Sequence, residues 1–332
     1  MSEYKGVKGF TVQNLSADPP APIEGQVWYN TTSNVLKGYA PVTGAWASGG
    51  ALNTAKQNIA GAGTQTATLC IGGYGVGILD QSESYNGSTW TEGNNLNLTR
   101  AYMCGMGTQT AALGCAGSSP SPVASDEVES YDGTCWSEGN DLNTGRGYDP
   151  GAAGTQTAGL VFGGGNPPVA ITELWDGTSW TEVNNMLTAA KEGAGSFGTN
   201  TAAIFAGSRN GATVTADVES WDGTSWTEVN NLNSARGGGG GSGTQTAGIA
   251  FGGRVSPTAS PISPGYTEQY DGTSWTEVAD LATSRAALGA GVSSPNTLSI
   301  CFGGNGAPDV SATNTICEEW TAGVSVVTFT SS

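Results

Sequence analysis

The sequence contains no histidine, few charged residues and no long apolar run, and each absence excludes a class of function. Without histidine, the chain lacks the commonest general base, the commonest zinc ligand and the usual activator of a nucleophilic serine or cysteine. No apolar run approaches the length of a membrane-spanning helix, and the N-terminal MSEYKGVKGF lacks the apolar part of a secretion signal. We therefore expect no membrane insertion and no signal-directed secretion.

The few charges that are present are mostly acidic. Only 12% of the 332 residues are charged, with 28 Asp and Glu against 11 Lys and Arg, for a formal net charge of −17. A field of this sign repels phosphate backbones and anionic lipids. Neither nucleic acid nor a membrane surface is therefore an expected partner.

Six cysteines are present, and no two of them form a CxxC pair. Most fall where sister copies of a repeat, described below, carry Val, Ile, Gly or Ser, which predicts small, buried, free thiols. Cys104 and Cys115 flank a predicted hairpin, so a disulfide between these two remains an alternative. The six are Cys70, Cys104, Cys115, Cys135, Cys301 and Cys317.

A tryptophan-containing phrase occurs five times. Glycine, with 53 residues, is frequent enough to suggest a low-complexity chain, but the ten Trp and ten Tyr recur in register, which is not typical of disorder. The tryptophan at the sixth position of the phrase recurs at intervals of 44 to 49 residues, a period typical of β-propellers. The copies are YNGSTWTE (85–92), YDGTCWSE (131–138), WDGTSWTE (175–182), WDGTSWTE (221–228) and YDGTSWTE (270–277).

Each repeat contains four phrases in the same order, and we count six units. A Leu-Asn-Thr-Ala-Arg type segment is followed by a small-residue run ending in GTQTA, by an apolar burst closing in Gly-Gly or Ala-Gly, and by a Glu with an aromatic partner. The basic residues are Lys56, Arg100, Arg146, Lys191, Arg236 and Arg285, and the glutamates are Glu83, Glu129, Glu173, Glu219, Glu268 and Glu318. Because catalytic groups are singular and these are periodic, we predict one structural ion pair per unit.

The phrases predict four antiparallel strands per unit. The apolar bursts are short and bounded by glycine, as in buried strands, and Asp-Gly between two aromatic segments is a strong hairpin signal. In the third unit we expect strands at 147–154, 158–164, 171–175 and 179–183. One such sheet cannot bury both its faces, so we predict an all-β, six-bladed propeller, with seven blades as the alternative.

The first 44 residues differ from the repeats. We assign residues 1–44 to an N-terminal arm with a β-hairpin at 25–39, expected to dock a neighbouring protein, and residues 45–332 to the propeller. Trp46 stands 44 residues before Trp90, in the register of a fourth strand, so we expect the strand around it to complete the last blade. In the alternative, residues 324–329 complete that blade and the hairpin is a separate appendage.

The phrases resemble two groups of proteins. The Gly-Gly after an apolar strand, the Glu-x-Tyr/Trp-Asp strand, the following Trp and the preceding basic residue resemble the kelch repeat over roughly residues 45–322. The leader KGFTVQNLSADPPAPIEGQVWYNTTSNVLK, the GTQTAGLVFGG-like phrases and the EEWTAG…TFTSS ending together resemble kelch-type structural proteins of tailed, especially marine, bacteriophages. Kelch enzymes that use copper ordinarily bind it through histidine, which this chain lacks.

The resemblance implies a non-enzymatic virion protein, made in the host cytoplasm and present in multiple copies. We expect a tail or fibre component that assembles with other virion proteins and attaches to a host-surface glycan or protein receptor. One alternative is a capsid decoration or head-fibre protein. Another is a propeller that binds or hydrolyses carbohydrate, which for hydrolysis needs two carboxylates facing each other across a sugar. The repeats single out no such pair.

The loops between the second and third strands vary most from unit to unit. All six are expected on one face, and they are rich in Pro, Ser and Gly, as loops on a rigid scaffold often are. Candidate binding residues in them are Tyr74, Asp126, Asn166, Arg209, Asn210, Arg254, Tyr266 and Asp309. The acidic group of Asp126, Glu127 and Glu129 lacks the EF-hand pattern, so we predict no metal site and no cofactor.

Overall fold

The computed structural model describes residues 12–20, 26–119, 124–255, 263–306 and 312–329. The chain divides into two compact units, one formed by Met1–Gly44 with Ala322–Ser332 and the other by Ala45–Thr321. The first boundary falls where the repeats begin, whereas the C-terminal residues group with the N-terminal segment. Strands make up the regular structure of the described residues, with no helix among them, which confirms the all-β class.

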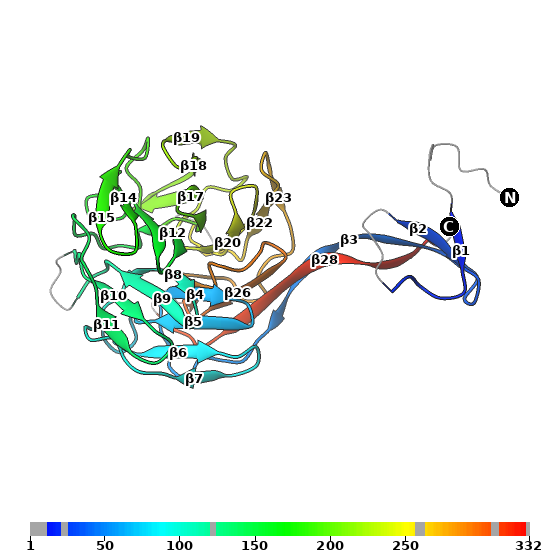
Figure 1. Cartoon of the computed structure of the whole chain (residues 1–332), viewed down its shortest axis with the longest axis horizontal. Coiled ribbons are helices and arrows are strands. Elements are labelled where there is room, and N and C mark those ends of the chain that lie inside the picture. The colour runs from blue at the N-terminus through cyan, green and yellow to red at the C-terminus, as the bar shows by residue number, and fades with distance from the viewer. Residues whose placement is uncertain (1–11, 21–25, 120–123, 256–262, 307–311, 330–332) are drawn as a thin grey trace. The chain divides into compact units, whose positions relative to one another are not determined.

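Five four-stranded antiparallel sheets follow one another along the second unit, each with its strands in chain order (Figure 1). We number these sheets from first to fifth. The first comprises β4 (Ala60–Thr64), β5 (Ala67–Ile71), β6 (Ser82–Tyr85) and β7 (Trp90–Glu92); the second β8 (Cys104–Thr108), β9 (Ala111–Cys115), β10 (Val128–Tyr131) and β11 (Trp136–Glu138); the third β12 (Gly151–Thr155), β13 (Ala158–Phe162), β14 (Thr172–Trp175) and β15 (Trp180–Val183). The fourth comprises β16 (Gly195–Thr199), β17 (Ala202–Asn210), β18 (Thr213–Trp221) and β19 (Trp226–Val229), and the fifth β20 (Gly240–Thr244), β21 (Ala247–Phe251), β22 (Thr267–Tyr270) and β23 (Trp275–Glu277).

The sixth sheet combines strands from both ends of the chain. Its order is β1-β2-β3-β28-β26-β25, and a two-stranded ladder of β24 and β27 accompanies it. These strands are β1 (Gln13–Leu15), β2 (Val27–Asn30), β3 (Val35–Ser48), β24 (Arg285–Ala286), β25 (Gly289–Ala290), β26 (Leu298–Phe302), β27 (Asn305–Gly306) and β28 (Cys317–Phe329). As expected, the strand around Trp46 is the neighbour of β28, and residues 324–329 belong to β28 itself rather than to a fourth strand.

Trp46 takes the contacts of a fourth-strand tryptophan. Its indole Nε1 donates a 3.1 Å hydrogen bond to Thr267 Oγ1 in the fifth sheet, just as Trp226 in the fourth sheet donates to Thr172 in the third. Its ring also packs against Trp320 of its own sheet, with centroids 5.5 Å apart. The first repeat-like tryptophan of the chain therefore belongs to the last sheet.

The sheets adjoin one another through their innermost strands in a propeller-like arrangement. β4 contacts β8, and the series continues through β12, β16, β20 and β25, which contacts β4 again. The glutamine of each GTQTA turn reinforces this contact. Gln156 Nε2 donates to the carbonyl oxygen of Tyr131 in the preceding sheet at 2.6 Å, and Gln65 in the first sheet donates to that of Trp320 in the sixth, also at 2.6 Å.

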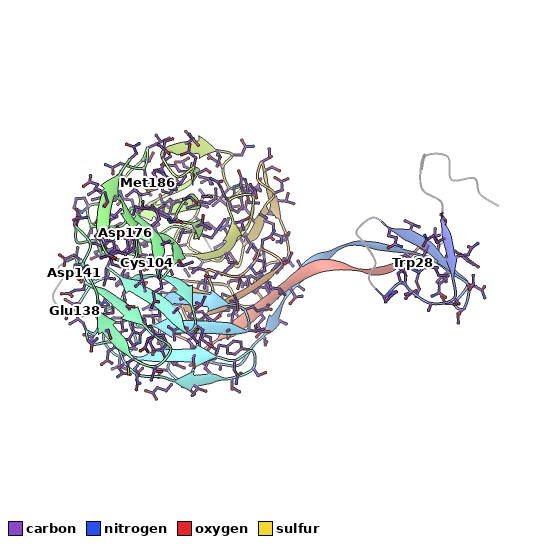
Figure 2. All side chains as sticks on the ribbon, viewed as in Figure 1. Trp28, Cys104, Glu138, Asp141, Asp176 and Met186 are labelled. Carbon is purple, nitrogen blue, oxygen red and sulfur yellow. The ribbon has the colours of Figure 1, made fainter. Side chains whose placement is uncertain are left out.

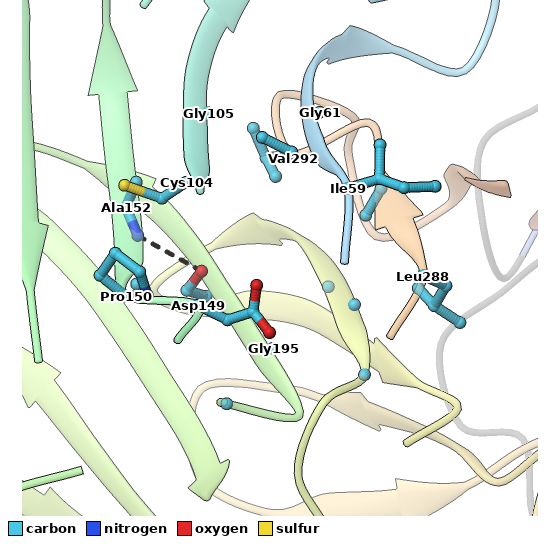
Figure 3. Close-up of a pocket in the computed structure, with 18 of the residues that line it drawn as sticks. Ile59, Gly61, Cys104, Gly105, Asp149, Pro150, Ala152, Gly195, Leu288 and Val292 are labelled. Carbon is cyan, nitrogen blue, oxygen red and sulfur yellow. Dashed lines mark hydrogen bonds between the residues drawn. The ribbon is translucent and has the colours of Figure 1, made fainter. Parts of the chain in front are cut away.

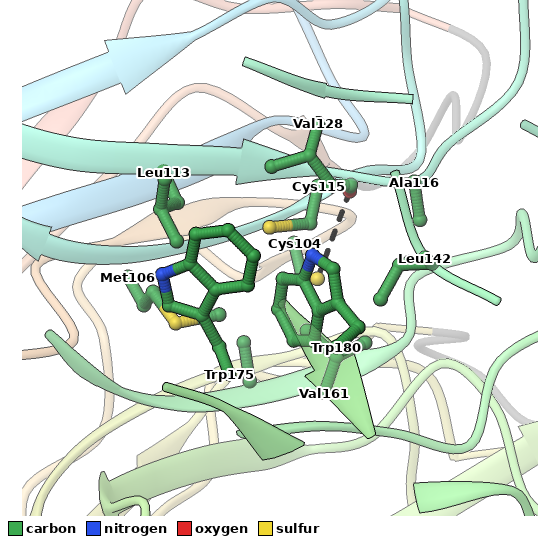
Figure 4. Packing of buried hydrophobic residues seen from close by; sticks show 11 residues of the cluster. Cys104, Met106, Leu113, Cys115, Ala116, Val128, Leu142, Val161, Trp175 and Trp180 are labelled. Atoms are coloured by element: carbon green, nitrogen blue, oxygen red, sulfur yellow. Dashed lines mark hydrogen bonds between the residues drawn. The ribbon is translucent and has the colours of Figure 1, made fainter. Parts of the chain in front are cut away.

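Aromatic side chains fill the space between neighbouring sheets. In Figure 4, Trp175 and Trp180 of the third sheet lie beside Cys104, Met106 and Leu113 of the second, within one buried cluster. Equivalent clusters recur between the other sheets, and Figure 2 shows how densely side chains cover the ribbon of this unit. Because packing at this density leaves few voids, each sheet depends on its neighbours for stability.

Glycine is frequent because the innermost strands approach one another closely. A Cβ on Gly105 in β8 would lie 2.5 Å from the backbone oxygen of Gly61 in β4, and a Cβ on Gly61 would clash with the backbone oxygen of Ala290 in β25. Any larger residue would force the sheets apart at these positions. The glycine content therefore reflects packing near the centre rather than disorder.

The first unit has its own small polar centre. β1 runs parallel to β2, which forms an antiparallel hairpin with β3. Asp18 accepts hydrogen bonds from Trp28 Nε1 at 3.1 Å and Asn30 Nδ2 at 2.8 Å and forms a 2.7 Å ion pair with Lys37. The hydrogen bond from Lys37, and then that from Asn30, lower the pKa of the Asp18 carboxyl.

Two details differ from the sequence predictions. The first strand of the third unit begins at Gly151 rather than at residue 147, because Tyr148 and Asp149 have left-handed backbone angles, with φ of 60° and 52°. Cys135 is exposed rather than buried, because it lies in the turn between β10 and β11, where sister copies carry Ser or Thr. Cys104 and Cys115 stand opposite each other as free thiols, as predicted, and the Cys104 thiol lies 3.7 Å from the Cys115 carbonyl oxygen.

Candidate binding pocket

Five of the six periodic basic residues pair with the glutamate of their own unit. Lys56 lies 3.0 Å from Glu83, Arg100 lies 2.8 Å from Glu129, and Arg285 lies 3.0 Å from Glu318. Arg146 pairs with Glu173 and Arg236 with Glu268 in the same way. All ten side chains are buried. They lie inside the sheets, away from any surface that a substrate could reach.

Each of these glutamates also organises the chain that leads into its sheet. Glu173 Oε2 accepts hydrogen bonds from the backbone nitrogen of Asn143 at 2.7 Å and from Asn143 Nδ2 at 2.8 Å. The Arg146 guanidinium in turn donates to the carbonyl oxygen of Ile171 at 2.9 Å. Since buried charges need partners for every polar atom, the whole Leu-Asn-Thr-Ala-Arg phrase acts as one structural unit.

The fourth unit departs from this pattern. Lys191 makes no ion pair with Glu219; its Nζ lies 3.2 Å from Asn166 Oδ1 and 4.6 Å from the centre of the Tyr148 ring. Glu219 keeps only the backbone donors of Leu187 and Thr188, at 2.8 and 3.0 Å. Burial raises the pKa of the Glu219 carboxyl. Ala190, the residue before Lys191, takes the place of the periodic cation, because its carbonyl oxygen accepts from the backbone nitrogen of Gly164 as that of Arg146 accepts from Gly117.

The Asp-Gly phrases form turns. Asp222 Oδ1 accepts hydrogen bonds from the backbone nitrogens of Thr224 and Ser225, both at 2.8 Å, and Gly223 supplies the positive φ of 92° that the turn requires. Asp132, Asp176 and Asp271 make the same contacts, and these backbone donors lower the pKa of each carboxyl. The Asp-Gly part of the repeated phrase thus forms the turn between the third and fourth strands of its sheet.

A closed ring of six backbone hydrogen bonds links the sheets near their innermost strands. Each residue donates its backbone N–H to the carbonyl oxygen of the ring residue in the preceding sheet, at 2.7 to 3.2 Å. In order, the members are Asn58, Tyr102, Asp149, Glu192, Gly238 and Ala287, and Asn58 donates to Ala287. All six have positive φ, between 49° and 69°. Since each sheet contributes one residue, the ring brings one residue from every sheet close together.

Two cavities adjoin this ring. One, of about 80 Å³, is lined by the glycine-rich starts of the innermost strands, and Figure 3 shows the Asp149 carboxylate among its lining residues. The other, of about 300 Å³, is lined by polar residues and includes two members of the variable loops, Arg209 and Arg254. We call this larger cavity the pit. Its walls are Gln57, Asn58, Tyr102, Tyr148, Asp149, Glu192, Arg209, Gly238, Arg254, Ala286 and Ala287.

Charged groups of both signs share the pit. Arg209 Nη1 lies 2.6 Å from Glu192 Oε2. Burial raises the pKa of the Asp149 carboxyl well above its usual value, and the Glu192 carboxylate raises it further, against the opposing effect of Lys191 and Arg254. Burial, and then the nearby Arg209, lower the pKa of the Arg254 guanidinium. The Arg254 Nε atom is buried and has no hydrogen-bond acceptor.

The structure brings only some of the predicted loop residues together. Arg209 and Arg254 line the pit, and Asn166 reaches its edge through Lys191 and Tyr148. The others do not line it: Tyr74, Asp126 and Asn210 are exposed elsewhere, and Tyr266 is half-buried. Asp309 lies outside the described residues.

Sequence reasoning missed the ring residues that make up most of the pit. Tyr102, Tyr148, Asp149 and Glu192 all lie just after the basic residue of their unit; Tyr148 and Asp149 were assigned to a first strand, and Tyr102 and Glu192 were given no role. A signal was present, because the third unit has one more residue between its basic residue and the first strand, and in the fourth unit the basic residue stands five rather than four residues after the preceding buried apolar residue. The repeat was aligned on its constant phrases, and these changes were not used.

Other kinds of site find no support in the described residues. Within these ranges no cluster of three or more Cys, Asp and Glu side chains is placed to hold a metal ion. No helix long and apolar enough to cross a membrane occurs in the same part of the chain.

No protein-family model matches this chain, and no curated protein sequence matches it either. The kelch and bacteriophage resemblances therefore rest on the phrases quoted above.

Proposed function

We propose that the second unit is a six-bladed, kelch-like propeller closed by β3. Support comes from the cyclic contacts of the innermost strands, from the six-membered backbone ring, and from Gln65, which repeats across the first and sixth sheets the contact made by Gln156 between the second and third. A closed propeller leaves few free sheet edges, which suits a protein exposed to harsh surroundings.

The proposed role is that of a non-enzymatic virion protein in a bacteriophage tail or fibre. The observation that carries the proposal is that the residues repeated in every unit and the residues that depart from the repeat lie in different places. Five buried ion pairs repeat through the sheets, as in a scaffold, whereas the departures from the repeat gather at one pit on the side of the variable loops. An attachment protein needs a rigid scaffold that presents one surface of non-repeated residues to its receptor. The virion setting rests on the leader resemblance, with other virion proteins as partners of the arm.

Cryo-electron microscopy of purified particles of the phage that encodes the chain, with mass spectrometry of the same particles, tests this role. We expect the chain in the particles and propeller-shaped density on the tail or its fibres. Density on the capsid instead would favour the head-decoration alternative. Particles that lack the chain would contradict a virion role altogether.

A carbohydrate-active propeller is the second candidate, and one observation favours it. Asp149 and Glu192 are neighbours in the backbone ring and line the same pit. Their surroundings differ, because burial raises the pKa of Asp149 whereas Glu192 is paired with Arg209. Paired carboxyls in contrasting surroundings are the usual arrangement for glycoside hydrolysis. Release of reducing sugars from a host polysaccharide by the purified protein, lost in Asp149→Asn, would establish this activity.

A further inference from the structure

Two consecutive units depart from the repeat where the pit forms. In four units the ring residue follows the periodic basic residue by two positions, as Tyr102 follows Arg100. In the third unit the interval is three, from Arg146 to Asp149, so that one residue is added. In the fourth unit Ala190 takes the place of the basic residue, because its carbonyl oxygen accepts from the backbone nitrogen of Gly164 as that of Arg146 accepts from Gly117, and the ring residue Glu192 follows by the usual two positions. The backbone ring closes in every unit, and the side chains at the pit differ.

The longer interval of the third unit adds an aromatic wall. Both Tyr148 and Asp149 adopt positive φ there, and the ring centre of Tyr148 lies 5.3 Å from that of Tyr102. The carboxyl group of Asp149 lines the same cavity. Positive φ is unfavourable for a residue as bulky as tyrosine, and such strain persists only where the surrounding structure imposes it.

The fourth unit carries its cation one residue later than the other units. Ala190 fills the position from which the other units pair with their glutamate, and Lys191, the next residue, lies over Tyr148 with Nζ 4.6 Å from the ring centre. Glu192 enters the backbone ring and binds Arg209. The fourth unit thus places one positive and one negative charge at the pit.

The pit collects every cation of the second unit that the buried ion pairs do not use. Eight Lys and Arg residues lie between residues 45 and 321, and five of them are in the buried pairs. The remaining three are Lys191, Arg209 and Arg254, and all three lie in or beside the pit. Two carboxyl groups, Asp149 and Glu192, line the pit as well, so cations exceed carboxyl groups there by one in a chain whose net charge is −17, and this local excess favours an anionic ligand.

Arg254 is the arginine of the second unit that forms no ion pair with a described residue. Its Nε is buried without an acceptor, as are those of Arg100, Arg236 and Arg285, but these three guanidiniums each pair with a glutamate, and Arg209 pairs with Glu192. A guanidinium is shaped to hold a carboxylate through two parallel hydrogen bonds. Arg254 is therefore suited to bind a carboxylate that enters the pit.

We propose that the pit binds a saccharide that carries a carboxylate. Arg254 holds the carboxylate, Tyr102 and Tyr148 supply an apolar wall for the sugar ring, and Asp149, Glu192 and Asn58 bind hydroxyl groups. At about 300 Å³ the cavity is at the small end of ligand sites, large enough for a sugar unit. An acidic peptide fits less well, because its further carboxylates would meet Asp149 and Glu192.

This inference deepens the proposed attachment role, on which it rests for its biological setting. Binding is measured on the isolated full-length protein and location on the virion, so that one idea can fail without the other. Loss of binding with the protein still on the tail would remove the ligand and leave the virion role. Binding by a protein absent from particles would do the reverse.

Isothermal titration calorimetry with a panel of sugars tests the proposal. Glucuronate, galacturonate and N-acetylneuraminate are compared with glucose and galactose, their neutral counterparts, and with a Glu-rich peptide. We expect at least one acidic sugar to bind at least tenfold more tightly than any neutral sugar and than the peptide. Immobilised polygalacturonate, added as a second arm, separates recognition of a polymer from recognition of the free monosaccharide.

Two variants and one control locate the binding. Arg254→Gln and Asp149→Asn should each weaken binding of the acidic sugar at least tenfold, whereas Asp271→Asn, in an exposed turn remote from the pit residues in the fold, should leave it unchanged. Thermal melts confirm that all three variants are folded. Equal binding of neutral and acidic sugars, tighter binding of the peptide, no binding by any probe, or full binding by folded Arg254→Gln would each overturn the proposal.

Discussion

Arg146 and Lys191 are the basic residues of consecutive repeats, yet they do different things. Arg146 is buried in its sheet against Glu173, whereas Lys191 lies beside Asn166 and Tyr148 at the edge of the pit. Ala190, the residue before Lys191, makes the backbone contacts that Arg146 makes in the third unit. The comparison teaches that a repeat can keep its backbone contacts while its cation moves by one residue to another place.

The largest expected effect comes from breaking a regular pair. Arg146→Met removes the partner of Glu173 and leaves a buried carboxylate without its counter-charge, which costs about 3–5 kcal/mol of unfolding free energy. Lys191→Met, at the basic residue of the fourth unit, should cost less than half as much, because Glu219 has no ion pair to lose. Urea unfolding of both variants measures the difference. Equal losses would show that the two positions are not distinct.

The next effect concerns the contact between the first and sixth sheets. Gln65→Ala leaves the carbonyl oxygens of Ser299 and Trp320 without this donor, and an unsatisfied buried group costs about 1–3 kcal/mol. Gln156→Ala, between the second and third sheets, is the matched control and should cost a similar amount. A negligible effect at Gln65 alone, seen by urea unfolding, would contradict equivalence of the closing contact.

A smaller effect, of opposite sign, is expected in the pit. The pKa of Asp149 is raised in the folded protein, so its proton stabilises the fold below the unfolded pKa, and this stability is lost as pH rises through the folded pKa. Asp149→Asn, which tolerates positive φ, should therefore melt at a higher temperature than the parent near pH 7. Near pH 3 the two should melt alike. Scanning calorimetry across this range checks the sign, and a less stable variant at pH 7 would contradict it.

The smallest effect belongs to the exposed turns. Asp222→Ala should lower the melting temperature slightly, because the backbone nitrogens of Thr224 and Ser225 lose their acceptor. Asp222→Asn should be milder, since Asn86 makes the same two contacts in the first unit. Backbone donors lower the pKa of Asp222, so the benefit of the charge is present above the unfolded pKa and disappears as pH falls through the folded pKa. Melting curves of the three proteins at pH 7 and near pH 3 test this order.

Much of the fold could be predicted from the repeats. Short apolar bursts bounded by glycine indicated strands, and Asp-Gly indicated the turns that Asp222 and its counterparts form. The 44-residue interval from Trp46 to Trp90 indicated that the N-terminal strand joins the last sheet. These predictions succeeded because each depends on local chemistry that six copies repeat.

The pit could not be predicted in this way. Arg209 and Arg254 were identified as loop residues, but Tyr148 and Asp149 were assigned to a strand, and Tyr102 and Glu192 were given no role. Nothing local indicates that residues from all six repeats lie round one cavity. Their meeting depends on the hydrogen-bonded ring.

Periodic phrases were thus sufficient for the strands, the turns and the partners of the buried charges, because each of these features is settled within one repeat and its neighbour. Which charges remain free, and where they gather, depends on how six sheets meet near their innermost strands. One added residue between Arg146 and Asp149, or a cation carried by Lys191 instead of the residue before it, has little meaning along the chain. Each matters in the folded protein because the closed backbone ring holds every sheet at a fixed register, so that such a change alters the side chains at the pit.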